Sequence, residues 1–197
     1  MEAGVVLRGA KVDNPLAQAL GFLEAYGAPR DDPLSSSFDE ADLRAANRGG
    51  ARISAAQVAA ILERRNEIEG ALGAIDPAAS LTRRSVPWAE LTRLFDAFGG
   101  IHGVGFSKMT KALHPKRPAL VPMLDSVVQA HLGGAPTAES FGERATELVR
   151  RYKEDLDRNR PALRELRKEL ASRGYRLTEV RILDLVIWSA FAAGRDP

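Results

Sequence analysis

The chain has 197 residues and a formal net charge of +2, and 45% of its residues are hydrophobic while 27% are charged. These fractions are ordinary for a soluble globular protein, and the length suits one large domain or two small ones. The absence of cysteine excludes disulfides, zinc–thiolate sites and iron–sulfur clusters. No apolar run reaches the ~18 residues that span a bilayer, and the first residues lack the basic start and apolar middle of a signal peptide. We therefore expect a cytoplasmic protein with no membrane partner.

The N-terminal half of the sequence predicts a series of helices from the signals described next. Strand signals are nearly absent from it. Apolar residues at helical spacing predict a first helix from Pro15 to about Tyr26. Capping boxes at residues 37–40 and 54–57 predict two further helix starts. The first of these helices ends at the glycines 49 and 50, and the second continues through apolar positions up to residue 72. Pro87 suits the first turn of a helix that ends at glycines 99 and 100.

The C-terminal half also has helical patterning. Seventeen of the 31 residues from 143 to 173 are charged, and apolar residues recur among them at amphipathic spacing. Pro161 predicts that this stretch forms two helices or one kinked helix. Thr178 caps a final helix over residues 179–193, in which Asp184 is expected to pair with Arg181 one turn earlier. The predicted fold class is therefore all-α, with many helices.

The sequence predicts a single helical unit over residues 1–197 that allows a division into two lobes. Residues 38–133 would form one lobe, and residues 1–37 together with 134–197 would form the other. The connections are predicted at residues 27–37, which contain two prolines and three serines, and at residues 133–136, which read Gly-Gly-Ala-Pro. No repeat or long low-complexity linker divides the chain further.

A local excess of positive charge lies in the middle of the chain. No acidic residue occurs between Asp96 and Asp125. The same stretch contains four basic residues, which are Lys108, Lys111, Lys116 and Arg117. On a nearly neutral protein this pattern indicates a defined anionic partner. The alternative is that these residues form an ordinary solvated basic surface.

Within this stretch, residues 101–105 read Ile-His-Gly-Val-Gly and separate two predicted helices. Gly103 and Gly105 flank one small apolar residue, so the backbone is free to turn tightly and to expose consecutive amides. At the start of the following helix, unpaired N–H groups and the helix dipole favour an anion. By itself, the pattern also fits a simple tight turn between two helices.

These five residues resemble the hairpin of the helix-hairpin-helix (HhH-GPD) DNA glycosylase superfamily, whose usual form is Leu-Pro-Gly-Val-Gly. In that superfamily the hairpin amides bind a DNA phosphate, and an essential aspartate follows about twenty residues later at the start of a helix. Asp125 follows Gly105 by twenty residues and comes directly after the apolar run 120–124. The resemblance therefore assigns Asp125 the catalytic position. Independently of it, Asp125 is a good N-cap for a helix that begins at Ser126.

The sequence departs from the superfamily pattern at several positions. Ser107 stands where bifunctional members carry a nucleophilic lysine, and Lys108, one residue further, would point about 100° away on a helix. The resemblance therefore implies a monofunctional enzyme without lyase activity. His102 replaces the usual proline, and the stretch from 106 to 128 is more similar to an uncharacterised bacterial family, which implies no established function.

The expected function is that of a DNA-binding protein acting as a DNA N-glycosylase, which excises a damaged or modified base while Asp125 stabilises the sugar cation. The residues expected to bind DNA phosphate are Gly103, Val104, Gly105, Ser107, Lys108, Lys111, Lys116 and Arg117. His102 is a further candidate for a DNA contact. Two alternatives stay open: a non-catalytic helix-hairpin-helix module that binds DNA, and a helical interaction protein without a nucleic-acid role.

No cofactor is expected, apart from a monovalent cation for which the hairpin offers a place. A metal site formed by His102, His114 and His131 is a weak alternative, because their spacings match no compact ligand motif. DNA is the expected partner, and the protein is assumed to be a monomer.

Overall fold

The computed structural model describes residues 4–27 and 35–192 and is mostly helical, which confirms the predicted all-α class. In chain order the elements are β1 (Val6–Leu7), β2 (Ala10–Lys11), α1 (Pro15–Tyr26), α2 (Glu40–Arg48), α3 (Ala55–Glu63), α4 (Arg65–Gly73), α5 (Trp88–Asp96), α6 (Phe106–Leu113), the 3-10 helix η1 (His114–Lys116), α7 (Ser126–His131), α8 (Phe141–Ser172) and α9 (Glu179–Ala192). Among the described helices, none is both long and apolar enough to cross a membrane.

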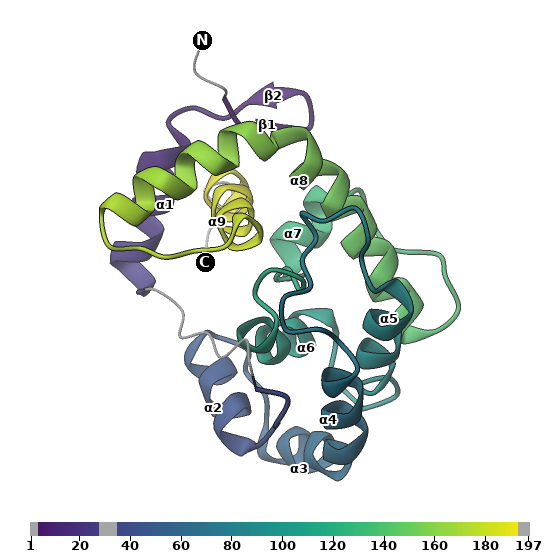
Figure 1. Ribbon diagram of the computed structural model, residues 1–197. Helices are drawn as coiled ribbons and strands as arrows, with labels where there is room; N and C mark the ends of the chain where they lie inside the picture. The colour runs from purple at the N-terminus through teal and green to yellow at the C-terminus, as the bar shows by residue number, and fades with distance from the viewer. Residues whose placement is uncertain (1–3, 28–34, 193–197) are drawn as a thin grey trace.

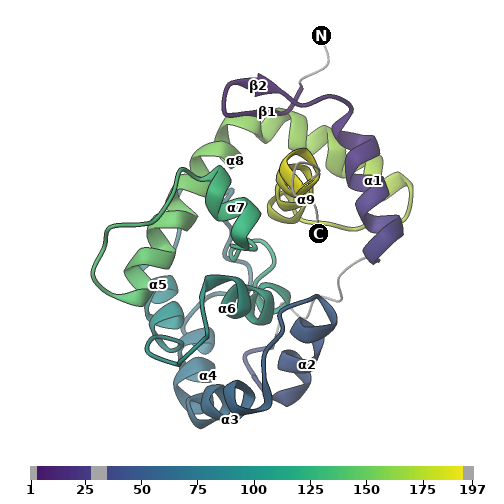
Figure 2. The ribbon, with the colours of Figure 1, turned by 180° about the vertical axis from the view of Figure 1, so that it is seen from behind.

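The helices gather in two groups, and α8 runs along both (Figures 1 and 2). Helix α9 lies among α1, α7 and α8, while α2 to α6 lie together on the other side of the molecule. Near its start α8 contacts α5, where the Gly142 amide donates to Asp96 Oδ1 at 2.6 Å. Further along, the Tyr152 hydroxyl donates to Val180 O on α9 at 2.6 Å. The exact lobe boundaries proposed from the sequence stay a prediction.

Helix caps explain where most helices begin. Ser54 and Gln57 form the predicted capping box of α3. The box of α2 instead uses Asp39 and Asp42, two residues later than the predicted box that begins at Ser37. The long helix predicted from residue 54 is interrupted at Arg64, which ends α3 and precedes α4. The pattern of apolar residues continues across this break, so periodicity alone does not reveal it.

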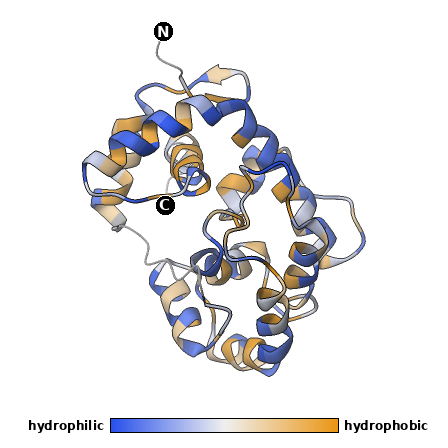
Figure 3. Ribbon diagram, viewed as in Figure 1, coloured by the Kyte–Doolittle hydropathy of each residue, from blue (hydrophilic) through white to orange (hydrophobic). Residues whose placement is uncertain are grey.

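The C-terminal helices are close to the prediction. Helix α8 is one continuous helix of 32 residues with Pro161 inside it, so the predicted split into two helices is wrong. The Thr178 hydroxyl accepts from the Arg181 amide at 3.1 Å and caps α9 as predicted. Figure 3 shows α9 as a largely hydrophobic helix with a few polar positions, in contrast to the mixed surface of α8.

Two short features complete the fold. Strands β1 and β2 form a small antiparallel hairpin that the sequence does not predict, because two-residue strands leave no alternating pattern. Asn159 of α8 holds it by accepting from Val6 N at 2.6 Å and donating to Val6 O at 2.9 Å. The predicted connection at residues 133–136 joins α7 to α8. Of the other predicted connection, residues 28–34 lie outside the described part of the chain.

Candidate functional site

The hairpin between α5 and α6 is anchored by its apolar residues and exposes its glycines. Ile101 and Val104 are buried, and Val104 N donates to Ile101 O at 3.1 Å to close the turn. Gly103 has a φ of +72°, a backbone conformation that other residues adopt only at a cost. Gly103 and Gly105 are exposed, so the polar backbone of the turn faces solvent. The predicted tight hairpin is therefore present.

Helix α6 begins at this hairpin without a side-chain cap. Gly105 is its N-cap residue, and no side chain accepts a hydrogen bond from the first turn. Within the described residues, the N–H groups of Phe106, Ser107 and Lys108 have no hydrogen-bond partner. Unpaired N–H groups at a helix start, together with the dipole, make a site that attracts an anion. The structure thus offers the amides that the sequence predicts for phosphate binding.

Gln57 of α3 connects the hairpin to the first turn of α6. Its amide nitrogen donates to His102 O at 3.3 Å, and its amide oxygen accepts from Lys108 Nζ at 2.7 Å. A Cβ atom at Gly103 would clash with the end of the Gln57 side chain, which would have to move away from the hairpin. Lys108 is half-buried and held beside the hairpin, while His102 is exposed at the turn.

Lys111 lies on the same helix, half-buried beside the loop that follows α2. Its ammonium group donates to Gly50 O at 3.2 Å. Burial lowers its pKa; the Asp125 carboxylate opposes this shift, and Arg181 and Arg52 add to it. Lys111 therefore lies close enough to Asp125 to interact with it electrostatically, and burial makes its charged form more costly.

Asp125 is the N-cap residue of α7, as its sequence context predicts. Its Oδ1 atom accepts from the amides of Val127 and Val128 at 2.9 and 3.0 Å. No described residue donates to its Oδ2 atom, and this oxygen is not among the buried polar atoms that lack a partner. The Oδ1 atom thus fixes the carboxylate at the start of α7, and the Oδ2 atom has no donor among the described residues.

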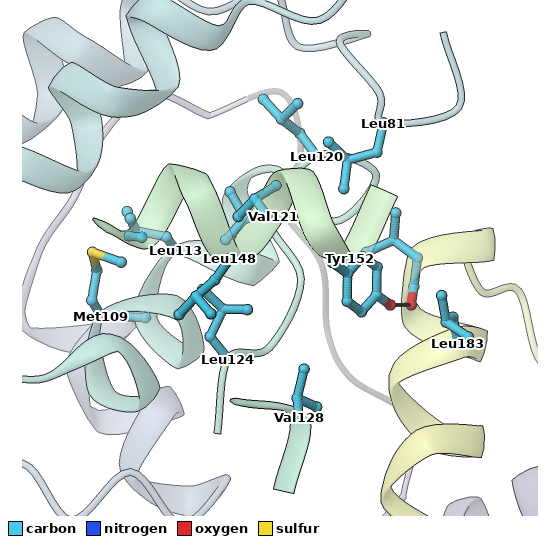
Figure 4. Packing of buried hydrophobic residues seen from close by; sticks show 14 of the residues in the cluster. Leu81, Met109, Leu113, Leu120, Val121, Leu124, Val128, Leu148, Tyr152 and Leu183 are labelled. Carbon is cyan, nitrogen blue, oxygen red and sulfur yellow. Dashed lines mark hydrogen bonds between the residues drawn. The ribbon is translucent and has the colours of Figure 1, made fainter. Parts of the chain in front are cut away.

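The segment before Asp125 is irregular and buried, and side chains hold it in place. Leu124 N donates to Thr110 Oγ1 at 3.0 Å, and His114 Nδ1 donates to Val121 O at 2.6 Å. Figure 4 shows the side chains of Val121 and Leu124 in the core beside α6 and α8. Because Thr110 belongs to α6, Asp125 is joined to the helix that begins at the hairpin.

Two of the predicted phosphate-binding residues are structural, and their prediction is wrong. Lys116 is buried and pairs with Asp42 Oδ1 of α2 at 2.8 Å. Arg117 is buried and donates to backbone carbonyl oxygens, including Leu72 O at 2.7 Å and Ile75 O at 3.3 Å just at and beyond the end of α4. Neither cation is exposed to a large ligand such as DNA, because both are used to join η1 to α2 and α4.

The three histidines lie in separate surroundings. His102 is exposed on the hairpin, and His114 is buried with a pKa lowered to about 3, chiefly by burial. His131 is buried and its Nε2 atom contacts Asp155 Oδ2 at 2.7 Å. In the described part of the chain, no group of three or more histidine or acidic side chains is placed to hold a metal ion. The weak metal-site alternative thus has no support from the geometry, and the monovalent cation at the hairpin stays a prediction.

Asp184 differs from its predicted role. It is buried, and no ion pair within 4.0 Å joins it to Arg181, so the expected pairing is wrong. Its Oδ2 atom instead accepts from Met123 N at 3.1 Å, two residues before Asp125. Burial raises the pKa of Asp184 to about 7, although Arg181 opposes the shift.

The structure brings together part of the predicted site and adds to it. The hairpin glycines, Ser107 and Lys108 lie at the start of α6, and Lys111 on the same helix lies toward Asp125. Gln57, Thr110 and Asp184 are not among the residues that the sequence predicts for the site. Of these, only Asp184 carries a signal in the sequence, as a lone acidic residue in an apolar helix.

Comparison with known proteins gives a family but no activity. No curated protein and no solved structure matches the chain. The family model that matches covers residues 18–191 and is described as a family of unknown function. Since this match spans most of the sequence, the chain belongs to the family of unknown function DUF6308.

Proposed function

We propose that this protein binds DNA through the hairpin and the start of α6, and that it acts as a monofunctional DNA N-glycosylase with Asp125 as its catalytic residue. The observation that carries the proposal is the connection between the two parts of the site. Helix α6 presents unpaired amides at its start, and its Thr110 holds the backbone of Leu124 next to Asp125. An anion bound at the hairpin would therefore have a defined position relative to the carboxylate.

The hairpin would contact DNA without reading its sequence. Backbone amides at a helix start and the ammonium group of Lys108 are suited to phosphate oxygens, which every sequence presents. Lys111 would add electrostatic attraction nearer to Asp125. Such contacts release counterions, so the affinity should fall steeply as salt is added.

Asp125 would act on the nucleotide that leaves the duplex. Hydrolysis of the N-glycosidic bond joins a water oxygen to the anomeric carbon while the base leaves with the bonding electrons and takes up a proton. The sugar is positively charged in the transition state, and a carboxylate near it stabilises this charge and orients the water. The Oδ2 atom of Asp125, to which no described residue donates a hydrogen bond, is the atom suited to this role. Ser107 at the nucleophile position favours hydrolysis without strand cleavage.

The second candidate is a non-catalytic DNA-binding module. It is favoured by the cap geometry, because two good hydrogen bonds to Val127 and Val128 explain Asp125 without any chemistry. In that case DNA binding would be retained, but no base would be released.

The deciding experiment measures release of free base from a panel of alkylated, deaminated and mismatched duplexes, with wild type and the Asp125→Asn variant. Asparagine caps a helix about as well as aspartate, so the variant should fold and bind DNA. Its excision rate should fall by about 10²-fold or more, because the charge facing the sugar is lost. The product should be an intact abasic site with no covalent trapping on borohydride reduction.

Each contrary result has a clear meaning. If wild type binds DNA but releases no base, or if Asp125→Asn is as active as wild type, the non-catalytic module is the better description. A DNA affinity that does not change with salt concentration would contradict the proposal that the protein binds DNA phosphates.

A further inference from the structure

We propose that Asp184 is a positioning residue for Asp125, and that it fixes the buried segment before Asp125 from the side of α9. This inference rests on the proposed function, which gives Asp125 its chemical role. It concerns a residue of the last helix, 59 positions beyond Asp125 in the sequence.

The need for such a residue follows from the backbone of residues 121–124. These residues are mostly buried but belong to no helix or strand, so their polar backbone groups have no regular partners. Buried backbone groups left unpaired are costly, and side chains must therefore supply the partners. Val121 O accepts a hydrogen bond from His114 Nδ1, and Leu124 N donates one to Thr110 Oγ1. Leu124 O accepts a further bond from Gln129 Nε2 at 2.7 Å.

Met123 N is the remaining amide of this segment, because residue 122 is a proline, and its acceptor is Asp184 Oδ2 at 3.1 Å. The other partners come from α6, η1 and α7, whereas Asp184 comes from α9. The segment is therefore held by α9 as well as by α6, η1 and α7. Removing Asp184 would release the segment from α9 and leave the partly buried Met123 amide without this acceptor.

The cost of burying Asp184 indicates that the bond to Met123 is not incidental. Asp184 is 3% exposed in a largely apolar helix, where the Tyr152 hydroxyl of α8 lies beside its carboxyl group. The titratable groups that face it are Arg181 on α9, Tyr152 on α8 and Asp125 itself. Burial dominates their effects and raises the pKa of Asp184 to about 7. A buried ionisable group is expensive unless it makes a specific interaction.

The conservative substitution distinguishes positioning from charge. Asparagine presents a carbonyl oxygen to Met123 N just as a carboxyl group does, so Asp184→Asn keeps the bond and removes the charge. Alanine removes the acceptor. If Asp184 acts by positioning, the asparagine variant should behave like wild type and the alanine variant should not.

The experiment compares wild type, Asp184→Asn and Asp184→Ala by amide hydrogen exchange and by single-turnover base release. Exchange of the Val127 and Val128 amides reports the cap that Asp125 makes. In Asp184→Ala their exchange should accelerate about fivefold or more, since the bonds to a displaced carboxylate weaken. The Ile68 amide, in α4, serves as a control and should not change. Base release should fall by up to about 10²-fold, as expected for a misplaced catalytic group, with DNA affinity unchanged.

The outcomes separate this inference from the proposed function. Unchanged exchange at Val127 and Val128 in Asp184→Ala, or equal losses in the asparagine and alanine variants, would overturn the inference. Absence of base release from wild type would overturn the proposed function, while the exchange measurement would still decide the role of Asp184. If the alanine variant does not fold, the NMR chemical shift of the Met123 amide in wild type is followed while the pH is varied through the range in which Asp184 titrates. A resonance that does not move in that titration would also overturn the inference.

Discussion

Gln57 accepts a hydrogen bond from the Lys108 ammonium group at 2.7 Å and thereby holds a cation beside the start of α6. The same side chain donates to His102 O in the hairpin, so one residue of α3 orders both the turn and the cation. A long lysine side chain loses considerable rotamer freedom when it is fixed. Because this loss is already incurred in the folded protein, a phosphate arriving at the α6 amides would meet a positioned charge.

The first prediction concerns the contribution of Lys108 to DNA binding. Replacing it in Lys108→Gln should weaken binding to all duplex sequences alike and reduce the slope of log Kd against log salt by about 1, as for the loss of one phosphate contact. Lys168→Gln is the matched control, since Lys168 is an exposed lysine of α8 that pairs with Glu165. Fluorescence anisotropy over a range of salt concentrations measures both slopes. Equal slopes for Lys108→Gln and wild type would contradict a phosphate contact at Lys108.

The second prediction concerns the turn of the hairpin. Gly103→Ala should lower the free energy of unfolding by about 1–2 kcal/mol, because alanine at a positive φ is strained and because its Cβ atom would displace Gln57. Gly70→Ala provides a control of opposite sign. Gly70 lies inside α4 with nothing within 4 Å of an added Cβ, so alanine should stabilise the protein there, by about 0.5–1 kcal/mol. Urea unfolding measures both, and a hairpin variant as stable as wild type would refute the strained turn.

The third prediction concerns the pH dependence of stability, to which two buried groups contribute with opposite signs. The pKa of His114 is about 3 in the folded protein against an ordinary 6.5, so its contribution to stability is lost as the pH falls from 6.5 toward 3. The pKa of Asp184 is about 7 against an ordinary 3.8, so its contribution is present below 3.8 and is lost as the pH rises toward 7. Between pH values of about 4 and 6.5 the two effects oppose each other.

Asp184→Asn should remove the contribution of Asp184 and leave that of His114. The free energy of unfolding of the variant should then rise more steeply with pH than that of wild type between about pH 4 and 6.5. Urea unfolding at several pH values measures this difference. Asp157→Asn, which changes a half-exposed carboxylate paired with Lys153, should follow the wild-type curve. A curve for Asp184→Asn that runs parallel to wild type would show that Asp184 is charged throughout this range.

Local chemistry in the sequence accounts for much of the fold and for part of the site. Capping residues such as Ser54 and Thr178 act on amides within three residues of themselves, so their effect is visible in a short stretch of sequence. The same is true of Asp125, whose cap bonds reach only Val127 and Val128. Glycine at 103 is likewise required by its own backbone conformation.

The remaining features depend on partners that are distant in the sequence. Lys116 and Arg117 look like exposed surface cations, but their partners Asp42 and Leu72 O lie 74 and 45 residues away. The bond between Asp184 and Met123 spans 61 residues. A charge pattern cannot separate a buried cation that joins two helices from an exposed one that awaits a ligand. Only tertiary packing makes that distinction.

The continuity of α8 has a consequence for how the protein folds. A helix of 32 residues is about 48 Å long at 1.5 Å per residue, and this one contacts α5 near its start and α9 further along. Neither group of helices is therefore complete without it, and we expect both to unfold in one cooperative transition. A fragment ending at residue 133 would leave the face of α5 beside Gly142 uncovered. Such a fragment should be aggregation-prone rather than independently folded. The core can therefore form only after the ribosome has synthesised α8.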